Sequence, residues 1–156
     1  MNLEVGTVFR WDNFPSHKFG GESKARWFVC LGSSEIFAQV AIVYLSTTTT
    51  QLQHFGTSGT RRNHSKFIFK TNEFPVFDKE CAIDFHEQPY SIELAKISNY
   101  QNDIETRGMI DENTMRMIYK RLSSSGFTSP KILNDLHASF NRAGITGLKK
   151  PKHRKK

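Results

Sequence analysis

Residues 25–47, ARWFVCLGSSEIFAQVAIVYLST, contain two apolar segments separated by Gly32-Ser33-Ser34. Both segments are rich in β-branched and aromatic residues, which favour strands. The glycine and serines between them are typical of a turn. The segments therefore predict strands over 25–31 and 37–47. Because the second segment is apolar on both faces, we expect it to lie in the middle of a sheet.

Shorter strand patterns flank these two segments on both sides. The predicted strands cover 6–14, 66–70, 81–83 and, as a strand or turn segment, 89–97. Polar loops that contain glycine, 15–24 and 51–65, interrupt the series. Short strands joined by turns are typical of a small barrel or sandwich.

The pattern changes to helical spacing after residue 110. Asp111 is suited to cap a helix whose apolar residues recur at helical spacing as far as Leu122. Ser129-Pro130 is a cap and first-turn pair for a second helix, with an apolar stripe as far as Phe140. The sequence thus predicts a mainly β fold with C-terminal helices. We expect a barrel domain with its helix over 1–122, an extra helix over 123–147, and a disordered basic tail over 148–156.

The formal net charge of +7 is concentrated at the end of the chain. Residues 148–156 carry six lysines and arginines and no acid, and the remaining chain is nearly neutral. Such a tail suits a phosphate backbone or an anionic membrane surface. The alternative is a solvated end that only aids solubility.

Cysteine usage and hydropathy indicate a cytoplasmic protein without cofactors. Cys30 and Cys81 lie in apolar segments without zinc-site or redox-motif spacing, so we expect buried, reduced thiols. No run of about 18 apolar residues predicts a transmembrane helix, and residues 1–4 do not begin a signal peptide. No phosphate loop, paired-carboxylate motif or metal triad is visible, so we expect neither a nucleotide cofactor nor a metal.

Two neighbouring strand ends could hold a phosphate. An arginine at a strand start beside a glycine loop, as in Lys24-Ala25-Arg26, can stabilise added negative charge; the alternative is a surface arginine. The stretch Ser46 to Gln51 places hydroxyls and backbone N–H groups at the end of a strand, although threonine also simply favours strands. We expect Arg26 and this stretch to converge on an anion-sized hollow beneath the two loops.

Histidines supply a second set of candidates, because imidazole exchanges protons near neutral pH. The four are His17, His54, His64 and His86. Two histidines can cleave RNA without metal, if one deprotonates the ribose 2′-hydroxyl and the other protonates the leaving 5′-oxygen. In Asp84-Phe85-His86-Glu87-Gln88 a carboxylate could orient a histidine. The alternatives are exposed loop histidines and a surface turn before Pro89.

Five segments, taken in order, resemble the MazF/PemK family of toxin endoribonucleases. They are 6–14 (GTVFRWDNF), 26–31 (RWFVCL), 43–51 (VYLSTTTTQ), 87–92 (EQPYSI) and 108–122 (GMIDENTMRMIYKRL). The resemblance covers roughly residues 4–122. The proline that usually follows the strand arginine is Trp27 here, and the family's second groove arginine has no clear counterpart, although Arg61-Arg62 could substitute.

The resemblance implies an SH3-like barrel with a C-terminal helix, commonly a homodimer, that cleaves single-stranded RNA without metal. The products would carry a 2′,3′-cyclic phosphate and a 5′-hydroxyl. Arg26 would contact the scissile phosphate, with Thr47 or Ser46 beside it. His17 would match the base of the first loop, and Glu87 the acidic residue of the RNA groove.

The RNA groove is expected between loops 15–24 and 51–65, with Phe19 or Phe55 available for base stacking. The expected substrate-binding residues are Lys24, Thr48, Arg61, Arg62, His64, Glu87 and Phe19. The implied protein partner is an antitoxin that fills the groove. Two alternatives stay open: a non-catalytic nucleic-acid-binding barrel, and a poison of a protein target like the CcdB-type relatives of the same barrel.

Overall fold

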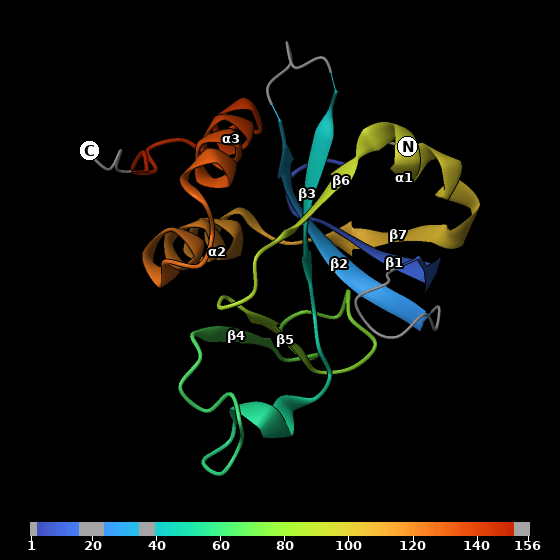
Figure 1. Cartoon of the computed structure of the whole chain (residues 1–156). Coiled ribbons are helices and arrows are strands. Elements are labelled where there is room, and N and C mark those ends of the chain that lie inside the picture. The colour runs from blue at the N-terminus through green and yellow to red at the C-terminus, as the bar shows by residue number, and fades with distance from the viewer. Residues whose placement is uncertain (1–2, 16–23, 35–39, 152–156) are drawn as a thin grey trace.

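The computed structural model describes residues 3–15, 24–34 and 40–151. Its main element is an antiparallel five-stranded sheet with the strand order β6-β3-β2-β1-β7 (Figure 1). The strands are β1 Thr7–Phe14, β2 Lys24–Ser33, β3 Ile42–Thr47, β6 Tyr90–Glu93 and β7 Ile104–Met109. The mainly β fold with C-terminal helices is confirmed. The described strands form an open sheet and not a closed barrel.

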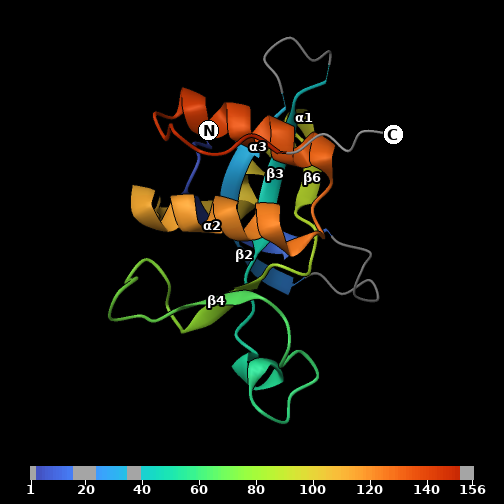
Figure 2. The same cartoon turned by 90° about the vertical axis from the view of Figure 1, so that its left-hand side faces the viewer.

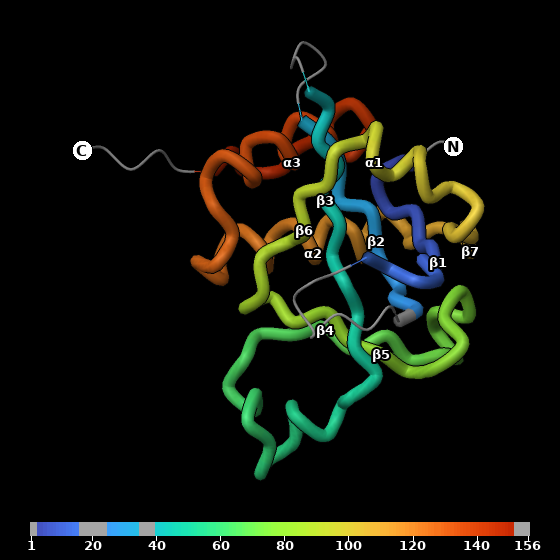
Figure 3. The backbone as a smooth tube through the Cα atoms, turned by 45° about the vertical axis from the view of Figure 1, so that its right-hand side comes forward, coloured from blue at the N-terminus to red at the C-terminus, as the bar shows by residue number. Residues whose placement is uncertain are grey.

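A second, two-stranded sheet pairs β4, Lys66–Phe69, with β5, Cys81–Asp84. It lies at one end of the main sheet, away from α1, Leu94–Asn99 (Figures 1 and 3). The two sheets are joined where Thr49 and Ala82 exchange backbone hydrogen bonds of 2.9 Å. The threonine stretch after β3 therefore connects the sheets.

Most predicted strands are present, with shifted limits. The expected strand over 37–47 begins at Ile42, and residues 35–39 lie outside the described residues. β3 is an interior strand, but the middle position belongs to β2. The segment 89–97 contains β6 and then most of α1, and the short helices η2, Leu52–Phe55, and η3, Gln101–Asp103, lie in connecting segments.

Both predicted C-terminal helices are confirmed, together with their caps. α2 spans Glu112–Ser125 and α3 spans Pro130–Arg142. The Asp111 side chain accepts a hydrogen bond from the Thr114 backbone N–H, and that of Ser129 accepts one from Ile132. α2 ends at Gly126, whose φ of +80° suits a residue without a Cβ.

The main sheet is covered on both faces by apolar side chains. α2 and α3 lie across one face (Figure 2) and bury a core with Val29, Leu31 and Tyr44 of the sheet. An aromatic cluster that includes Trp11 and Phe28 packs on the other face. Both helices thus share one core with the strands. The chain after α3 also joins this core, because Leu148 is buried in it.

The two cysteines are free and buried, as predicted. Burial raises the pKa of the Cys30 and Cys81 thiols to about 11. No helix in the described parts of the chain combines the length and the apolarity needed to cross a membrane.

Candidate functional site

The end of β5 and the loop that enters β4 bring a set of polar side chains together. Lys66 and Asp84 are paired in the hairpin register, and the Phe85 N–H donates to the carbonyl of Ser65 at 2.9 Å. The loop residues before β4 therefore lie beside the residues after β5. The resulting set, called here the histidine–carboxylate cluster, consists of Arg61, His64, Asp84, His86 and Glu87.

Asp84 is the centre of the histidine–carboxylate cluster. Its side chain is only 2% exposed, and its Oδ2 accepts from Arg61 Nη1 at 3.2 Å and from His64 Nδ1 at 2.8 Å. Its Oδ1 accepts from the backbone N–H of His86 at 2.9 Å. Three donors thus offset the cost of burying this carboxylate. Arg61 also contacts Glu87 Oε1 at 3.0 Å, which anchors the guanidinium between two acids.

The two imidazoles of the cluster lie face to face. The ring centroids of His64 and His86 are 4.2 Å apart, and the two rings are inclined by 11°. The ring of Phe127 also stacks on His86, with a centroid distance of 4.3 Å. Because a carboxylate only accepts, the His64 bond to Asp84 places the proton on Nδ1 and leaves Nε2 as a base. The His64 side chain is 31% exposed. The arrangement can therefore exchange protons with a ligand.

Not all predicted residues of this region belong to the cluster. Arg62 donates to the Gly59 carbonyl at 3.2 Å, and His54 bonds to Gln51 at 2.7 Å. The sequence predicts Arg61, His64 and Glu87 as separate groove residues, and the stretch Asp84 to Gln88 as a motif. Phe127 is not predicted, because its only sequence signal is an aromatic residue after a helix stop.

The strand ends around Arg26 are arranged differently from the expectation. Arg26 pairs with Trp11 and lies two residues from Phe28, which pairs with Thr47, so Arg26 and Thr47 share one face of the sheet. Ser46 lies on the opposite face, where it is buried. Of the two predicted hydroxyl residues, Thr47 therefore lies on the face of Arg26 and Ser46 does not.

The hollow at this end of β2 and β3 lies on the face opposite Arg26. It has a volume of about 260 Å³ and is lined by Ala25, Trp27, Thr48, Thr50, Phe77, Asp78, Lys79 and Cys81. The Cys81 thiol that lines the hollow is neutral, because burial raises the pKa of this thiol by more than the hydrogen bond with Thr48 lowers it. The cysteine of this hollow is therefore not activated as a nucleophile.

Lys24, His17 and Phe19 complete the set of predicted site residues. Lys24 begins β2 opposite Phe14, while His17 and Phe19 lie outside the described residues. Within the described ranges, no group of three His, Cys, Asp or Glu side chains is placed to hold a metal ion.

Comparisons with known proteins add no relative, since no family model, curated protein or solved structure matches this chain.

Proposed function

We propose that this chain is an endoribonuclease of the MazF/PemK toxin type that cleaves single-stranded RNA without a metal ion, with His64 and His86 as its proton-transfer pair. The observation that carries the proposal is the stacking of these rings beside the buried Asp84 carboxylate. The proposal assigns these two rings, which lie 22 positions apart in the sequence, as the base and the acid that act on one phosphate. The sheet followed by helices agrees with this proposal at the level of fold class.

In the proposed reaction, His64 Nε2 takes the proton of the ribose 2′-hydroxyl, and the 2′-oxygen attacks the adjacent phosphorus. The bond from phosphorus to the 5′-oxygen breaks, and a protonated His86 gives its proton to that oxygen. The products are a 2′,3′-cyclic phosphate and a 5′-hydroxyl. Asp84 stabilises the His64 imidazolium, and Arg61 adds positive charge beside the developing oxyanion.

The test is incubation of the purified full chain with mixed single-stranded RNA in EDTA, followed by mapping of the fragment ends. His64→Gln and His86→Gln should each slow cleavage by about a hundredfold to ten-thousandfold. His54→Gln is the matched control, because His54 lies in the same loop region and its ring bonds to Gln51, outside the histidine–carboxylate cluster. Its cleavage rate should equal that of the unmodified chain.

The Arg26-centred site expected from the family resemblance predicts another outcome. If Arg26→Ala abolishes cleavage while both histidine variants keep the full rate, the reacting groups lie at the start of β2. Absence of cleavage by the unmodified chain in every RNA tested contradicts the nuclease proposal itself.

A toxin of this type implies an antitoxin protein as partner, a homodimer and a cytoplasmic location, and all three belong to the proposal. A second candidate function is a non-catalytic RNA-binding module. The pairing of Arg61 Nη1 with both Asp84 and Glu87 supports the absence of catalysis in this candidate, since such networks also occur as purely structural ones. RNA binding with intact chains would identify the module. Growth arrest on expression with neither binding nor cleavage would indicate a poison of a protein target.

A further inference from the structure

Next to the histidine–carboxylate cluster, the aromatic stack ends on an exposed ring. Phe127 follows His86 at 4.3 Å with an inclination of 24°, and 45% of its surface is exposed. His64, His86 and Phe127 thus form a ladder of three nearly parallel flat rings. A fourth flat ring is the natural ligand for the open end of such a ladder, because offset stacking is favourable between π-systems.

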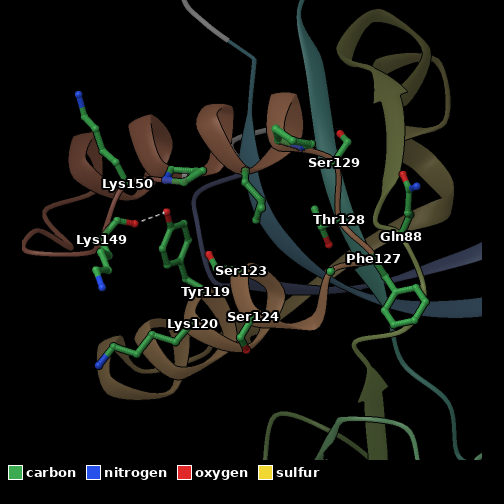
Figure 4. A pocket seen from close by; sticks show the side chains of 14 residues that line it. Gln88, Tyr119, Lys120, Ser123, Ser124, Phe127, Thr128, Ser129, Lys149 and Lys150 are labelled. Atoms are coloured by element: carbon green, nitrogen blue, oxygen red, sulfur yellow. Dashed lines mark hydrogen bonds between the residues drawn. The ribbon is translucent and has the colours of Figure 1, made fainter. Parts of the chain in front are cut away.

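Phe127 is one of the residues that line a pocket between α2, α3 and the chain after α3 (Figure 4). The pocket has a volume of about 810 Å³, within the range of about 300–1,000 Å³ that is typical of small-ligand sites. Figure 4 shows Phe127 and Gln88 at one side of it and Lys149 and Lys150 at the other. The Lys149 carbonyl accepts from the Tyr119 hydroxyl at 2.8 Å, which holds this wall in place.

A buried hydroxyl inside the pocket lacks a partner. Thr128 is 5% exposed, and its Oγ1 has no hydrogen bond within the described part of the chain. Buried polar groups of native proteins are nearly always hydrogen-bonded. Thr128 lines the pocket, and a rotation of its covered side chain would bring the hydroxyl to a ligand with donor or acceptor groups. Gln88, an exposed amide beside Phe127, can offer both donor and acceptor atoms.

The charge of the pocket selects an anionic ligand. Three lysines, Lys120, Lys149 and Lys150, line it, and none of its described lining residues is acidic. Proteins recognise single-stranded nucleic acid with the same kinds of group: a flat ring for stacking, an amide and a hydroxyl for contacts with the base edge, and ammonium groups for the phosphates.

We propose that the pocket between α2 and α3 binds a segment of single-stranded RNA, with one base stacked on Phe127 and the neighbouring phosphates at Lys149 and Lys150. This inference deepens the proposed function and rests on it, because the same strand would run from the pocket over His86 to His64. An acidic peptide would also meet the lysines. The flat, parallel ladder that ends on Phe127 favours a nucleobase over a peptide.

The experiment measures binding of a fluorescein-labelled 2′-O-methyl RNA of mixed sequence to the full chain by fluorescence anisotropy. This probe cannot be cleaved, because its 2′-oxygen carries no proton to lose. Phe127→Ala should weaken binding about fivefold to a hundredfold, and Phe127→Trp should retain it. Leu94→Ala, which shortens a similarly exposed apolar side chain on α1, is the matched control and should leave binding unchanged.

Thr128→Val provides a second variant that does not depend on the stack. Removing the unpartnered hydroxyl should weaken RNA binding about twofold to tenfold while leaving thermal stability unchanged or higher. A stability loss equal to the binding loss would contradict a ligand-contacting role.

The inference fails if Phe127→Ala and Thr128→Val both bind the probe like the unmodified chain. It also fails if a peptide of alternating Glu and Leu, and not the RNA, binds in a manner that depends on Phe127. Failure of the proposed function is distinct. Binding that depends on Phe127 without cleavage of ordinary RNA would refute the nuclease and keep the site. Cleavage of ordinary RNA at a rate that does not depend on Phe127 would keep the nuclease and refute the site.

Discussion

Asp84 determines the chemistry of the histidine–carboxylate cluster, since its carboxylate orients the His64 ring and holds Arg61. Its surroundings differ sharply from those of Glu87, the other acid that Arg61 contacts. The Asp84 side chain is 2% exposed and that of Glu87 is 39% exposed. The two carboxylates therefore contribute unequally, because solvent screens the exposed pair.

Asp84→Asn should lower the free energy of unfolding by about 1–3 kcal/mol, because buried donors lose a charged acceptor. Glu87→Gln should lower it by less than about 1 kcal/mol. Urea denaturation followed by tryptophan fluorescence measures both. Equal losses in the two variants would contradict the central role of Asp84.

Cys30 and Cys81 should resist alkylation in the folded protein. Their pKa values of about 11 lie above the ordinary value, so at pH 8 the reactive thiolate is scarce and increases only as the pH rises towards 11. We expect slow reaction with a disulfide reagent at pH 8, and reaction of both thiols at the rate of free cysteine in denaturant. Rapid reaction of either thiol in the native protein would show that it is accessible.

At the scale of single elements, α2 depends on its N-cap. The carboxylate of Asp111 accepts from the backbone N–H and the hydroxyl of Thr114, at 3.0 and 2.7 Å. These hydrogen bonds hold the pKa of Asp111 below its ordinary value of 3.8. A depressed pKa means that the carboxylate stabilises the fold above its ordinary pKa, and that this contribution is lost as the pH falls through the folded value.

Asp111→Ala should therefore lower stability by about 1 kcal/mol at pH 7. Asp111→Asn keeps a capping oxygen, so it should cost less at pH 7. The stability difference between the unmodified chain and this asparagine variant should shrink as the pH falls from 5 to about 2. Thermal unfolding by circular dichroism across this range measures it, and a difference that is constant with pH would contradict the assignment.

For the whole molecule, the contact between α3 and β2 joins the helices to the sheet. Gly32 has a φ of +143°, and a Cβ built there would lie 2.5 Å from Ser139 Cβ. The Ser139 hydroxyl donates to the Ser33 carbonyl and accepts from the Ser33 N–H, both at 2.9 Å. Without a side chain at residue 32, the helix can approach the strand closely enough for these bonds.

Gly32→Ala should cost about 2–4 kcal/mol, because backbone strain and overpacking add. Gly144→Ala is the control: φ there is +87° and no atom lies within 4 Å of the added Cβ, so only the backbone cost of about 1 kcal/mol applies. Chemical denaturation compares them. Equal costs would show that α3 tolerates a shift away from β2.

The strands and helices differ in how well the sequence predicts them. β2, β3 and both C-terminal helices were predictable, since apolar spacing and the capping residues Asp111 and Ser129 act within a few positions of the chain. α1 and β7 were harder, because most of their side chains are exposed and carry little apolar pattern. The described strands do not close into a barrel, and the sequence could not show this, since periodicity does not report whether the outer strands of a sheet meet.

In the candidate site, too, the residue types could be predicted from the sequence and their arrangement could not. His64, Arg61 and Glu87 were identifiable by residue type, whereas their assembly around Asp84 required the β4–β5 pairing that joins positions 20 or more apart. The stack of His86 on Phe127 joins the turn after β5 to the segment between α2 and α3, 41 positions apart.

From the sequence alone came most of the strands, the two C-terminal helices with their caps, the buried thiols and the inventory of reactive side chains, because local spacing and side-chain chemistry decide these. Only the tertiary structure decided the strand order, the separation of Arg26 from Ser46, and the neighbours of Asp84 and Phe127. The physical reason is that side chains far apart in the chain become neighbours only when the packing of the whole core selects one arrangement.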